Sequence, residues 1–220
     1  MPALNDPHHG QPVLTLGPDL SAARLTMIMV HGRGASAEDI LALAGEFGTT
    51  DVAFVAPQAA GHTWYPYSFL APLNDNEPGI TSGLDVIAAL VDGLAARQIP
   101  HARIGLLGFS QGACLVLEFA ARHPKRYAAV VGLSGGLIGP PGTPREYPGS
   151  LSGAPMFLGC SDVDTHIPLA RVRETADVFR GMGASVDERI YPRMGHMVNQ
   201  DEIRAVNALL LSNLRHGSDT

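Results

Sequence analysis

The fold is decided by IGLLGFSQG, Ile104 to Gly112, with the apolar stretch GACLVLEFAA continuing from Gly112 to Ala121. The opening apolar run predicts a buried strand, and the stretch that ends the segment, apolar on nearly every side, predicts a buried helix. Between them stands Gly-x-Ser-x-Gly, whose glycines permit a sharp strand-to-helix turn that pushes the hydroxyl of Ser110 out of the fold. In isolation the pentapeptide would also fit a serine that caps a helix. The strand before it and the helix after it favour an exposed serine at a strained turn.

On both sides of this turn, short apolar runs alternate with longer segments of helical period, which is typical of βαβ units around a mainly parallel sheet. Five runs are apolar nearly throughout, as expected of strands covered on both faces, and the sixth alternates like an edge strand. In chain order the expected strands are Leu25–Val30, Val52–Val55, Ile104–Leu107, Ala128–Leu133, Met156–Leu158 and Val186–Tyr191. We predict an α/β fold with a mainly parallel central sheet and helices on both faces.

Two further helices are predicted by apolar residues at three- and four-residue steps, which form one buried face. These residues are Ile80, Leu84, Ile87, Val91 and Leu94 in one helix, and Ile203, Val206, Leu210 and Leu214 in the other. Ser36 and Asp39 resemble a capping box and predict another helix start, with Ile40, Leu43, Ala44 and Phe47 facing inward.

The 220 residues, 45% of them hydrophobic, suffice for one compact domain. We expect a single domain over residues 1–220, with residues 1–10 as a flexible N-terminal segment. Pro66–Gly79 and Gly135–Gly153 are rich in turn-forming residues. They are too short for a second domain or a large lid domain, and we expect them to form loops at the rim of a site.

The formal net charge of −6 comes from scattered Asp and Glu and argues against nucleic acid as a partner. The first ten residues lack the basic and apolar regions of a secretory signal, and no later apolar run reaches the roughly 18 residues of a membrane helix. We therefore expect a cytoplasmic protein without a membrane span; a homodimer is left open. Cys114 and Cys160 are interpreted as buried small hydrophobes rather than as a disulfide.

A serine hydroxyl is a useful nucleophile at neutral pH only when a neighbouring base, usually histidine, takes its proton. His196 is the candidate, because it follows the last predicted strand in Met194-Gly195-His196 and so fits the chain order serine, acid, base. The alternative is a loop histidine that caps the final helix. His31 and His62 precede Ser110. The remaining histidines are expected at the surface or, in one case, at the rim of the site: His8, His9, His101, His123, His166 and His216.

The acid is expected between Ser110 and His196, at the end of a strand, and Cys160-Ser161-Asp162-Val163-Asp164 follows such an end. From the residues alone, both Asp162 and Asp164 remain candidates. The carboxylate that is not used is expected to form a local turn. His166 is the second candidate base, although it lies close in sequence to its own acid.

An acyl-transfer site also needs backbone N–H donors for the oxyanion. One is expected at Gln111, directly after the serine, and the second at Arg33 in His31-Gly32-Arg33-Gly34, which follows the first strand. The same segment would also serve as a plain glycine turn, and the Arg33 side chain would suit an anionic group on the substrate. We expect Gly32, Trp64 and Ile167 to line the substrate pocket, with core packing as the alternative for Trp64.

With these residues placed, the chain resembles the phospholipase/carboxylesterase family of small α/β-hydrolases. The resemblance extends from Met27 to about Leu214 and rests on the segments HGRG, GFSQGA, DTHIP and YPRMGH. It implies an α/β-hydrolase fold and assigns the acid to Asp164, which stands before Thr165-His166-Ile167-Pro168. It also implies the roles of Ser110, His196 and the amides of Arg33 and Gln111.

The resemblance implies a serine carboxylesterase that cleaves small to medium acyl esters through an acyl-enzyme, without a metal or cofactor. Acyl thioesterase or lysophospholipase activity is the alternative within the family, and a non-catalytic binding module is the alternative outside it. Thioesterase members usually carry Asp where Ala35 stands, and often Trp-Phe-Asp where Trp64-Tyr65-Pro66 stands. These differences favour the bacterial carboxylesterases of the family and a small-molecule acyl substrate.

Overall fold

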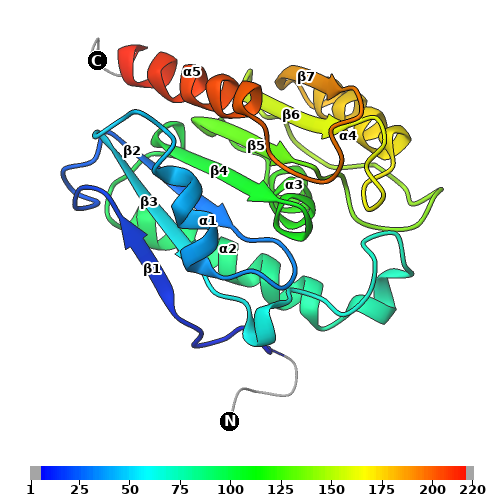
Figure 1. The fold of residues 1–220 in the computed structure, drawn as a ribbon. Helices are drawn as coiled ribbons and strands as arrows, with labels where there is room; N and C mark the ends of the chain where they lie inside the picture. Colours follow the sequence, from blue (N-terminus) through cyan, green and yellow to red (C-terminus); the bar gives the residue numbers. More distant parts are fainter. Residues whose placement is uncertain (1–5, 217–220) are drawn as a thin grey trace.

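The computed structural model describes residues 6–216, which form a seven-stranded sheet with helices on both faces (Figure 1). The strand order is β1-β3-β2-β4-β5-β6-β7, and all neighbouring strands are parallel except for the β1–β3 pair. The strands are β1 Val13–Leu16, β2 Leu25–Val30, β3 Val52–Pro57, β4 Ile104–Phe109, β5 Ala129–Leu133, β6 Pro155–Ser161 and β7 Ser185–Tyr191. The predicted α/β fold with a mainly parallel sheet is confirmed.

The sheet separates two hydrophobic clusters, because alternate residues of each strand point to opposite faces. Helices α2 (Gly79–Ala96), α3 (Gln111–Arg122) and α4 (Leu169–Gly181) cover one face. Helices α1 (Ala37–Ala44) and α5 (Gln200–His216) cover the other. In β2, for example, Ile28 packs under α2 and α3, whereas Met27 and Met29 pack on the opposite side. The short 3₁₀ turns are Ala60–His62, Leu73–Asn76 and His101–Arg103.

The predicted helices and edge strand are confirmed. Ser36 caps α1 in a reciprocal capping box with Asp39, and the five apolar residues expected on one face of α2 are all buried. Strand β7 lies at an edge of the sheet and is only partly buried, whereas β2 to β6 are buried almost throughout. Leu43 is only partly buried, and Leu41 takes its expected place in the core.

Two elements were not predicted from the sequence. Strand β1 pairs antiparallel with β3 and adds an outer edge to the sheet. Its sequence, VLTL, is mostly apolar but only four residues long, and Val13 and Leu16 are exposed because the strand lies at the edge of the sheet. Helix α4 interrupts its apolar stripe with Arg171, which is 4% exposed and bonded to Glu174. Both elements escape a search for apolar period alone.

Helix α2 corrects the expectation that no segment is long and apolar enough to cross a membrane. Its 18 residues meet that test by length and composition. In the structure, Ile80, Leu84 and Ile87 on its inner face pack in the cluster that α3 shares. A core helix passes the same test, so this finding is weak evidence for a membrane span.

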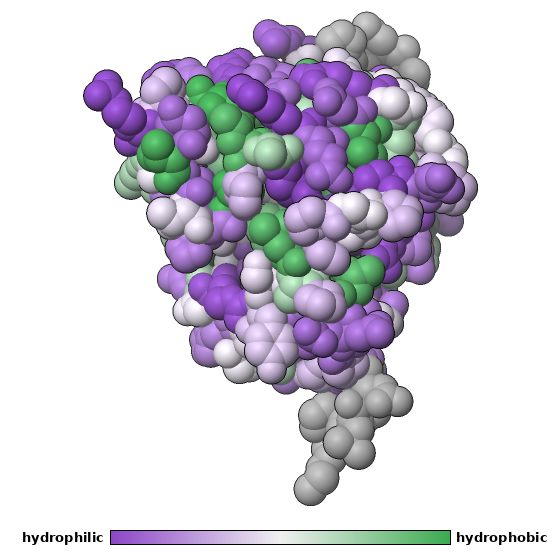
Figure 2. Space-filling view, turned by 90° about the vertical axis from the view of Figure 1, so that its right-hand side faces the viewer, coloured by the Kyte–Doolittle hydropathy of each residue, from purple (hydrophilic) through white to green (hydrophobic). Residues whose placement is uncertain are grey.

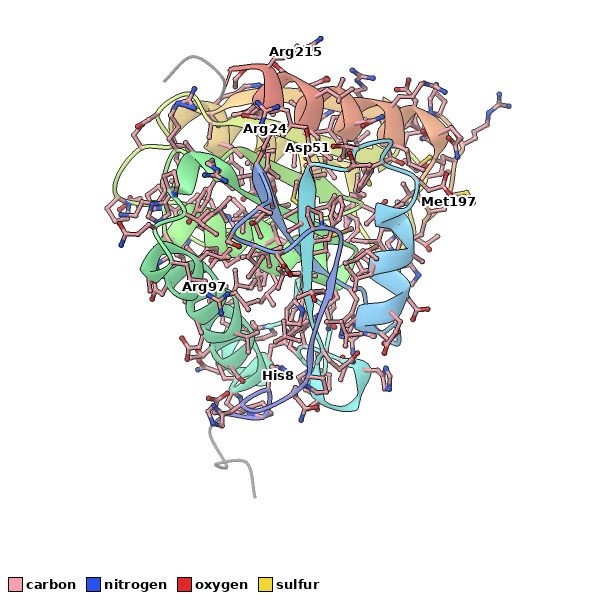
Figure 3. All side chains as sticks on the ribbon, turned by 90° about the vertical axis from the view of Figure 1, so that its left-hand side faces the viewer. His8, Arg24, Asp51, Arg97, Met197 and Arg215 are labelled. Carbon is pink, nitrogen blue, oxygen red and sulfur yellow. The ribbon has the colours of Figure 1, made fainter. Side chains whose placement is uncertain are left out.

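The N-terminal segment also differs from expectation. Residues 1–5 lie outside the described residues, but His8 is only 3% exposed and its ring is bonded to the loop that follows β3. Figure 3 shows His8 beside the start of α2 and this loop. The expectation that His8 is an ordinary surface residue is therefore wrong.

Candidate active site

Ser110 sits at the joint of β4 and α3 with φ 55° and ψ −120°, a backbone conformation that a side chain rarely adopts. The turn is tight because two glycines touch neighbouring backbone. A Cβ on Gly108 would lie 2.3 Å from the Gly112 oxygen, and a Cβ on Gly112 would lie 2.1 Å from the Val30 oxygen. No side chain fits at either position, so the Gly-x-Ser-x-Gly pattern is a steric requirement of this joint.

The side chain of His196 reaches Ser110 from the loop after β7. Its Nε2 lies 2.8 Å from Ser110 Oγ, at hydrogen-bond distance. Gly195, directly before it, has φ 82° and supplies the turn that brings the imidazole over the serine. The ring packs between Phe109 and His166, with centroid distances of 5.1 and 4.7 Å. These contacts hold the imidazole in one orientation.

Asp164 completes a chain of hydrogen bonds. Its Oδ2 lies 2.7 Å from His196 Nδ1, and its Oδ1 accepts the backbone amides of His166 and Ile167 at 2.8 and 3.0 Å. The Asp164 side chain is fully buried. Burial acts to raise the pKa of this carboxyl, but the bonds from His196 and the two amides outweigh it and hold the pKa below its ordinary value. Asp164 is thus a buried carboxylate that fixes the His196 tautomer with the proton on Nδ1.

The two rival candidates lie elsewhere in the same loops. Asp162 is exposed, and its Oδ1 accepts the backbone amide of Arg193 at 2.7 Å. It therefore joins the loops after β6 and β7 instead of forming the local turn that the sequence suggested. His166 is exposed at the rim of the cleft and contacts the His196 ring edge-on.

The amides of Arg33 and Gln111, the expected oxyanion donors, form no hydrogen bond with another group of residues 6–216. The Gly34 amide is occupied by the His62 carbonyl at 2.7 Å. The Gln111 side chain bridges to the next loop, accepting from the Trp64 amide at 2.9 Å and donating to the Tyr65 carbonyl at 2.8 Å. Both expected donors are therefore available in the described structure.

A cleft of about 520 Å³ opens beside Ser110. Of the pocket residues expected from the sequence, Ile167 lines it, whereas Gly32 and Trp64 do not. Gly32 is packed behind the serine, where a Cβ would lie 3.3 Å from the Cβ of Ser110. Trp64 is fully buried, so core packing is the correct alternative for it. The cleft is lined by Arg33, Tyr65, Pro66, Tyr67, Ser68, Phe69, Ser110, Gln111, Cys114, His166, Ile167 and His196.

Figure 2 looks onto the face toward which the parallel strands point, and it shows separate hydrophobic patches between hydrophilic ones. Three exposed large apolar side chains lie on the loops of this end: Tyr67 at 59%, Val163 at 52% and Met197 at 54% exposure. The approach to Ser110 therefore combines apolar and polar groups.

Both cysteines are free and buried, as expected. Cys114 also contributes to the cleft lining, one turn after Ser110 on α3, a position that its interpretation as a buried small hydrophobe did not predict. The thiol of Cys160 lies 3.7 Å from Asp164 Oδ2. Burial raises the pKa of both thiols to about 12, so each remains protonated at neutral pH.

A model of the family described as Phospholipase/Carboxylesterase matches residues 18–213. The chain belongs to the phospholipase/carboxylesterase family. This confirms the resemblance carried by the four sequence segments, and the matched range includes all three residues of the Ser110–His196–Asp164 chain.

Solved structures of esterases are also similar to this chain. A phospholipase/carboxylesterase from Dyadobacter fermentans is 36% identical, with a TM-score of 0.88 over 92% of this chain and 97% of that one. The esterase PE8 is 25% identical, with a TM-score of 0.74 and the same coverage. The α/β-hydrolase fold of this family, with its order of strands and helices, is therefore the fold of this chain.

Sequence relatives cover less of their own length. The acyl-protein thioesterase 1 of Schizosaccharomyces pombe is 30% identical over 125 residues, which are 51% of this chain and 56% of that protein. The chain spans between 38% and 61% of the length of six curated relatives that it matches. The names of these relatives are those of esterases, carboxylesterases and acyl-protein thioesterases.

His8 lies outside the part of the chain that the phospholipase/carboxylesterase model matches, yet it supports the site through Trp64. Its Nδ1 accepts the Ala60 amide at 3.1 Å, and its Nε2 donates to the Trp64 carbonyl at 2.8 Å. The Trp64 indole then donates to the His31 carbonyl at 2.9 Å. Burial lowers the pKa of both histidines and favours their neutral forms. Sequence inspection could not find this support, since it joins three separate segments.

Proposed function

We propose that the protein is a serine carboxylesterase that hydrolyses small to medium acyl esters. The observation that carries the proposal is a chain of two hydrogen bonds. Ser110 Oγ lies 2.8 Å from His196 Nε2, and His196 Nδ1 lies 2.7 Å from Asp164 Oδ2. Such a chain of hydrogen bonds activates a serine, because the imidazole takes the hydroxyl proton while the carboxylate stabilises the cation that forms. Membership of a family of esterases and thioesterases supports the same reaction class.

In the proposed reaction, Ser110 Oγ attacks the acyl carbon and its proton moves to His196 Nε2. The carbonyl oxygen becomes an oxyanion, which the Arg33 and Gln111 amides would stabilise by hydrogen bonds. His196 returns the proton to the leaving alcohol, and an acyl-enzyme on Ser110 remains. Water, deprotonated by His196, then attacks the acyl carbon, and His196 returns that proton to Ser110 Oγ as the acyl–oxygen bond breaks and the acid leaves. Each step transfers one proton through the same nitrogen.

The direct test is labelling of Ser110 by a fluorophosphonate, combined with turnover of p-nitrophenyl acetate. Ser110→Ala should abolish both. Ser185→Ala is the matched control. Ser185 is exposed at the start of β7, whereas Ser110 follows the end of β4, so the variant should leave labelling and turnover unchanged. Labelling or turnover that persists in Ser110→Ala would remove Ser110 from the mechanism.

Thioester hydrolysis is the second candidate, and similarity to an acyl-protein thioesterase favours it. The same acyl-enzyme forms from a thioester, so the two activities differ only in the leaving group. Comparing kcat/KM for matched oxygen esters and thioesters of one acyl group decides between them. A clear excess for the thioester would replace the carboxylesterase assignment and leave the role of Ser110 intact.

A further inference from the structure

The charge of the cleft is opposite to the charge of the chain as a whole. The formal net charge is −6, yet none of the described residues that line the cleft is Asp or Glu, and Arg33 lies among them. Asp164, the carboxylate bonded to His196, has a fully buried side chain and does not line the cleft. A cation in the lining, without an acidic residue beside it, creates a local positive field in an otherwise acidic molecule.

Contacts with backbone carbonyls hold the Arg33 side chain in place. Nη1 donates to the Pro66 carbonyl at 2.8 Å, and Nη2 donates to the Tyr65 and Tyr67 carbonyls at 2.9 and 2.6 Å. The guanidinium also lies 6.0 Å from the centroid of the Tyr65 ring, within cation–π range. Carbonyl oxygens stabilise the cation by their dipoles without neutralising it.

Within residues 6–216, no Asp or Glu forms an ion pair with Arg33, although nine ion pairs in this part of the chain involve another arginine. Of the five N–H donors of a guanidinium, the three bonds leave the Nε–H and one Nη1–H without a partner in this part of the chain. Arg33 is exposed, so these donors are accessible to a solute.

The residue next to Arg33 in the sequence packs against Ser110. Arg33 directly follows Gly32, whose Cβ position would lie 3.3 Å from the Cβ of Ser110. Its own amide is one of the two proposed oxyanion donors. An anionic group that met the guanidinium would therefore belong to the same molecule whose carbonyl meets Ser110.

We propose that the Arg33 guanidinium is a specificity-determining group that selects esters carrying a carboxylate or phosphate close to the scissile carbonyl. The inference rests on the proposed esterase function and deepens it. The anionic group would be on the acyl side or on the leaving-group side, and the chemistry recognised at Arg33 is the same in both cases. A guanidinium recognises such oxyanions by charge and by paired N–H donors.

Two matched pairs of substrates test the proposal. In the first, p-nitrophenyl butyrate is compared with mono-p-nitrophenyl succinate, which adds a carboxylate to the acyl group. In the second, phenyl butyrate is compared with 3-(butyryloxy)benzoate, which adds it to the leaving group. The readout is the ratio of kcat/KM for the anionic ester to kcat/KM for the neutral ester, in the wild-type chain and in variants. The ratio cancels any change of loop position that affects both substrates equally.

Arg33→Gln should lower this ratio by roughly 10- to 100-fold for one pair, since hydrogen bonds to charged groups contribute about 1.5–3 kcal/mol. Arg33→Lys should retain most of the ratio, because it keeps the charge. Arg97→Gln is the control for net charge: Arg97, labelled in Figure 3, is exposed at the C-terminal end of α2, does not line the cleft and should leave the ratio unchanged. The pair that responds identifies the side on which the anion lies.

The outcomes separate this proposal from the proposed function. Hydrolysis of all four esters with a ratio that Arg33→Gln does not change would overturn the role of Arg33 and leave the esterase function standing. Arg33 would then serve only to hold residues 65–67. Failure of the wild-type chain to hydrolyse any of the four esters, with no fluorophosphonate labelling, would overturn both.

Discussion

The His31 imidazole and the Gly32 carbonyl are joined by a hydrogen bond of 2.8 Å. The Ala59 amide donates to the other ring nitrogen, Nε2, at 3.1 Å, so the neutral ring carries its proton on Nδ1 and donates it to Gly32. The carbonyl of Gly32 and the amide of Arg33 belong to one planar peptide unit, and anchoring the first therefore orients the second. His31 thus positions one of the two proposed oxyanion donors without touching the substrate.

Substitution of His31 should consequently affect kcat more than KM. Gln places a side-chain amide near the position of Nε2 and Asn near that of Nδ1, so His31→Gln keeps an acceptor for Ala59 and His31→Asn keeps a donor for Gly32. We expect His31→Gln to lower kcat by about 10- to 100-fold, less than the loss of an oxyanion donor itself, and His31→Asn to lower it less. Steady-state kinetics with p-nitrophenyl acetate measures both. Equal losses in the two variants would show that the Gly32 bond is not the important one.

Asp164 and Asp162 should differ sharply when each is replaced by Asn. Asp164→Asn removes the carboxylate that fixes the His196 tautomer, and kcat should fall by about 10³- to 10⁴-fold. Asp162→Asn keeps an oxygen acceptor for the Arg193 amide, and kcat should change by less than about threefold. Circular dichroism checks that both variants are folded. The opposite order of the two losses would transfer the role to Asp162.

The backbone of Ser110 is strained in a way that glycine relieves. At φ 55° and ψ −120° a Cβ is unfavourable, so Ser110→Gly should be more stable than Ser110→Ala by about 1 kcal/mol, although both variants lose activity. Urea unfolding of the two inactive variants gives the difference directly. A Gly variant that is less stable than the Ala variant would mean that this conformation costs the chain nothing.

Glu202, in the first turn of α5, links stability to pH. Its side chain is fully buried, and Oε2 accepts the Asn199 amide at 2.8 Å, whereas Oε1 has no partner in the described structure. Burial raises the pKa of Glu202 to about 7, against an opposing contribution from the Asn199 amide and a reinforcing one from Asp201. The folded state therefore holds a proton that the unfolded state has already lost between about pH 4.5 and 7.

Because the folded state binds the extra proton, the free energy of unfolding should decrease as pH rises through this window. Glu202→Gln keeps an acceptor for Asn199 and removes the charge. We expect the variant to gain stability relative to the wild type by up to about 3 kcal/mol at pH 8 and to gain little at pH 4.5. Urea unfolding at pH 4.5, 6 and 8 measures this. A difference that is independent of pH would exclude Glu202 as the titrating group.

Patterns local in sequence predicted most of the sheet, four helices and the Ser110 turn, because buried parallel strands and glycine-flanked turns leave direct marks on composition. Strand β1 was missed although three of its four residues are apolar, because so short a run is a weak signal and its place in the sheet depends on pairing with the distant β3. Arg171 concealed α4, because a buried arginine bonded to Glu174 and to backbone carbonyls looks like a surface residue in the sequence.

The sequence alone could not decide which of two neighbouring carboxylates contacts His196, or whether Trp64 lines the pocket or packs in the core. Asp162 and Asp164 are two positions apart at the end of β6, and only the path of the loop decides which carboxylate reaches His196. Trp64 suited a pocket wall as well as a core, and its buried position beside His8, 56 residues away in the sequence, follows from the tertiary fold. The bond from His31 to Gly32, by contrast, is local and could have been considered from the His-Gly dipeptide.

Trp64 is the single tryptophan of the chain, and it lies between two imidazole rings, with centroid distances of 5.0 Å to His8 and 5.2 Å to His31. All intrinsic indole fluorescence of the protein therefore comes from one place, directly behind the loop that carries Arg33. Protonated imidazole quenches indole emission, so the intensity should fall in acid when either ring gains a proton. The wild-type molecule thus has a native optical reporter of this loop, which a fluorimeter can read without any label.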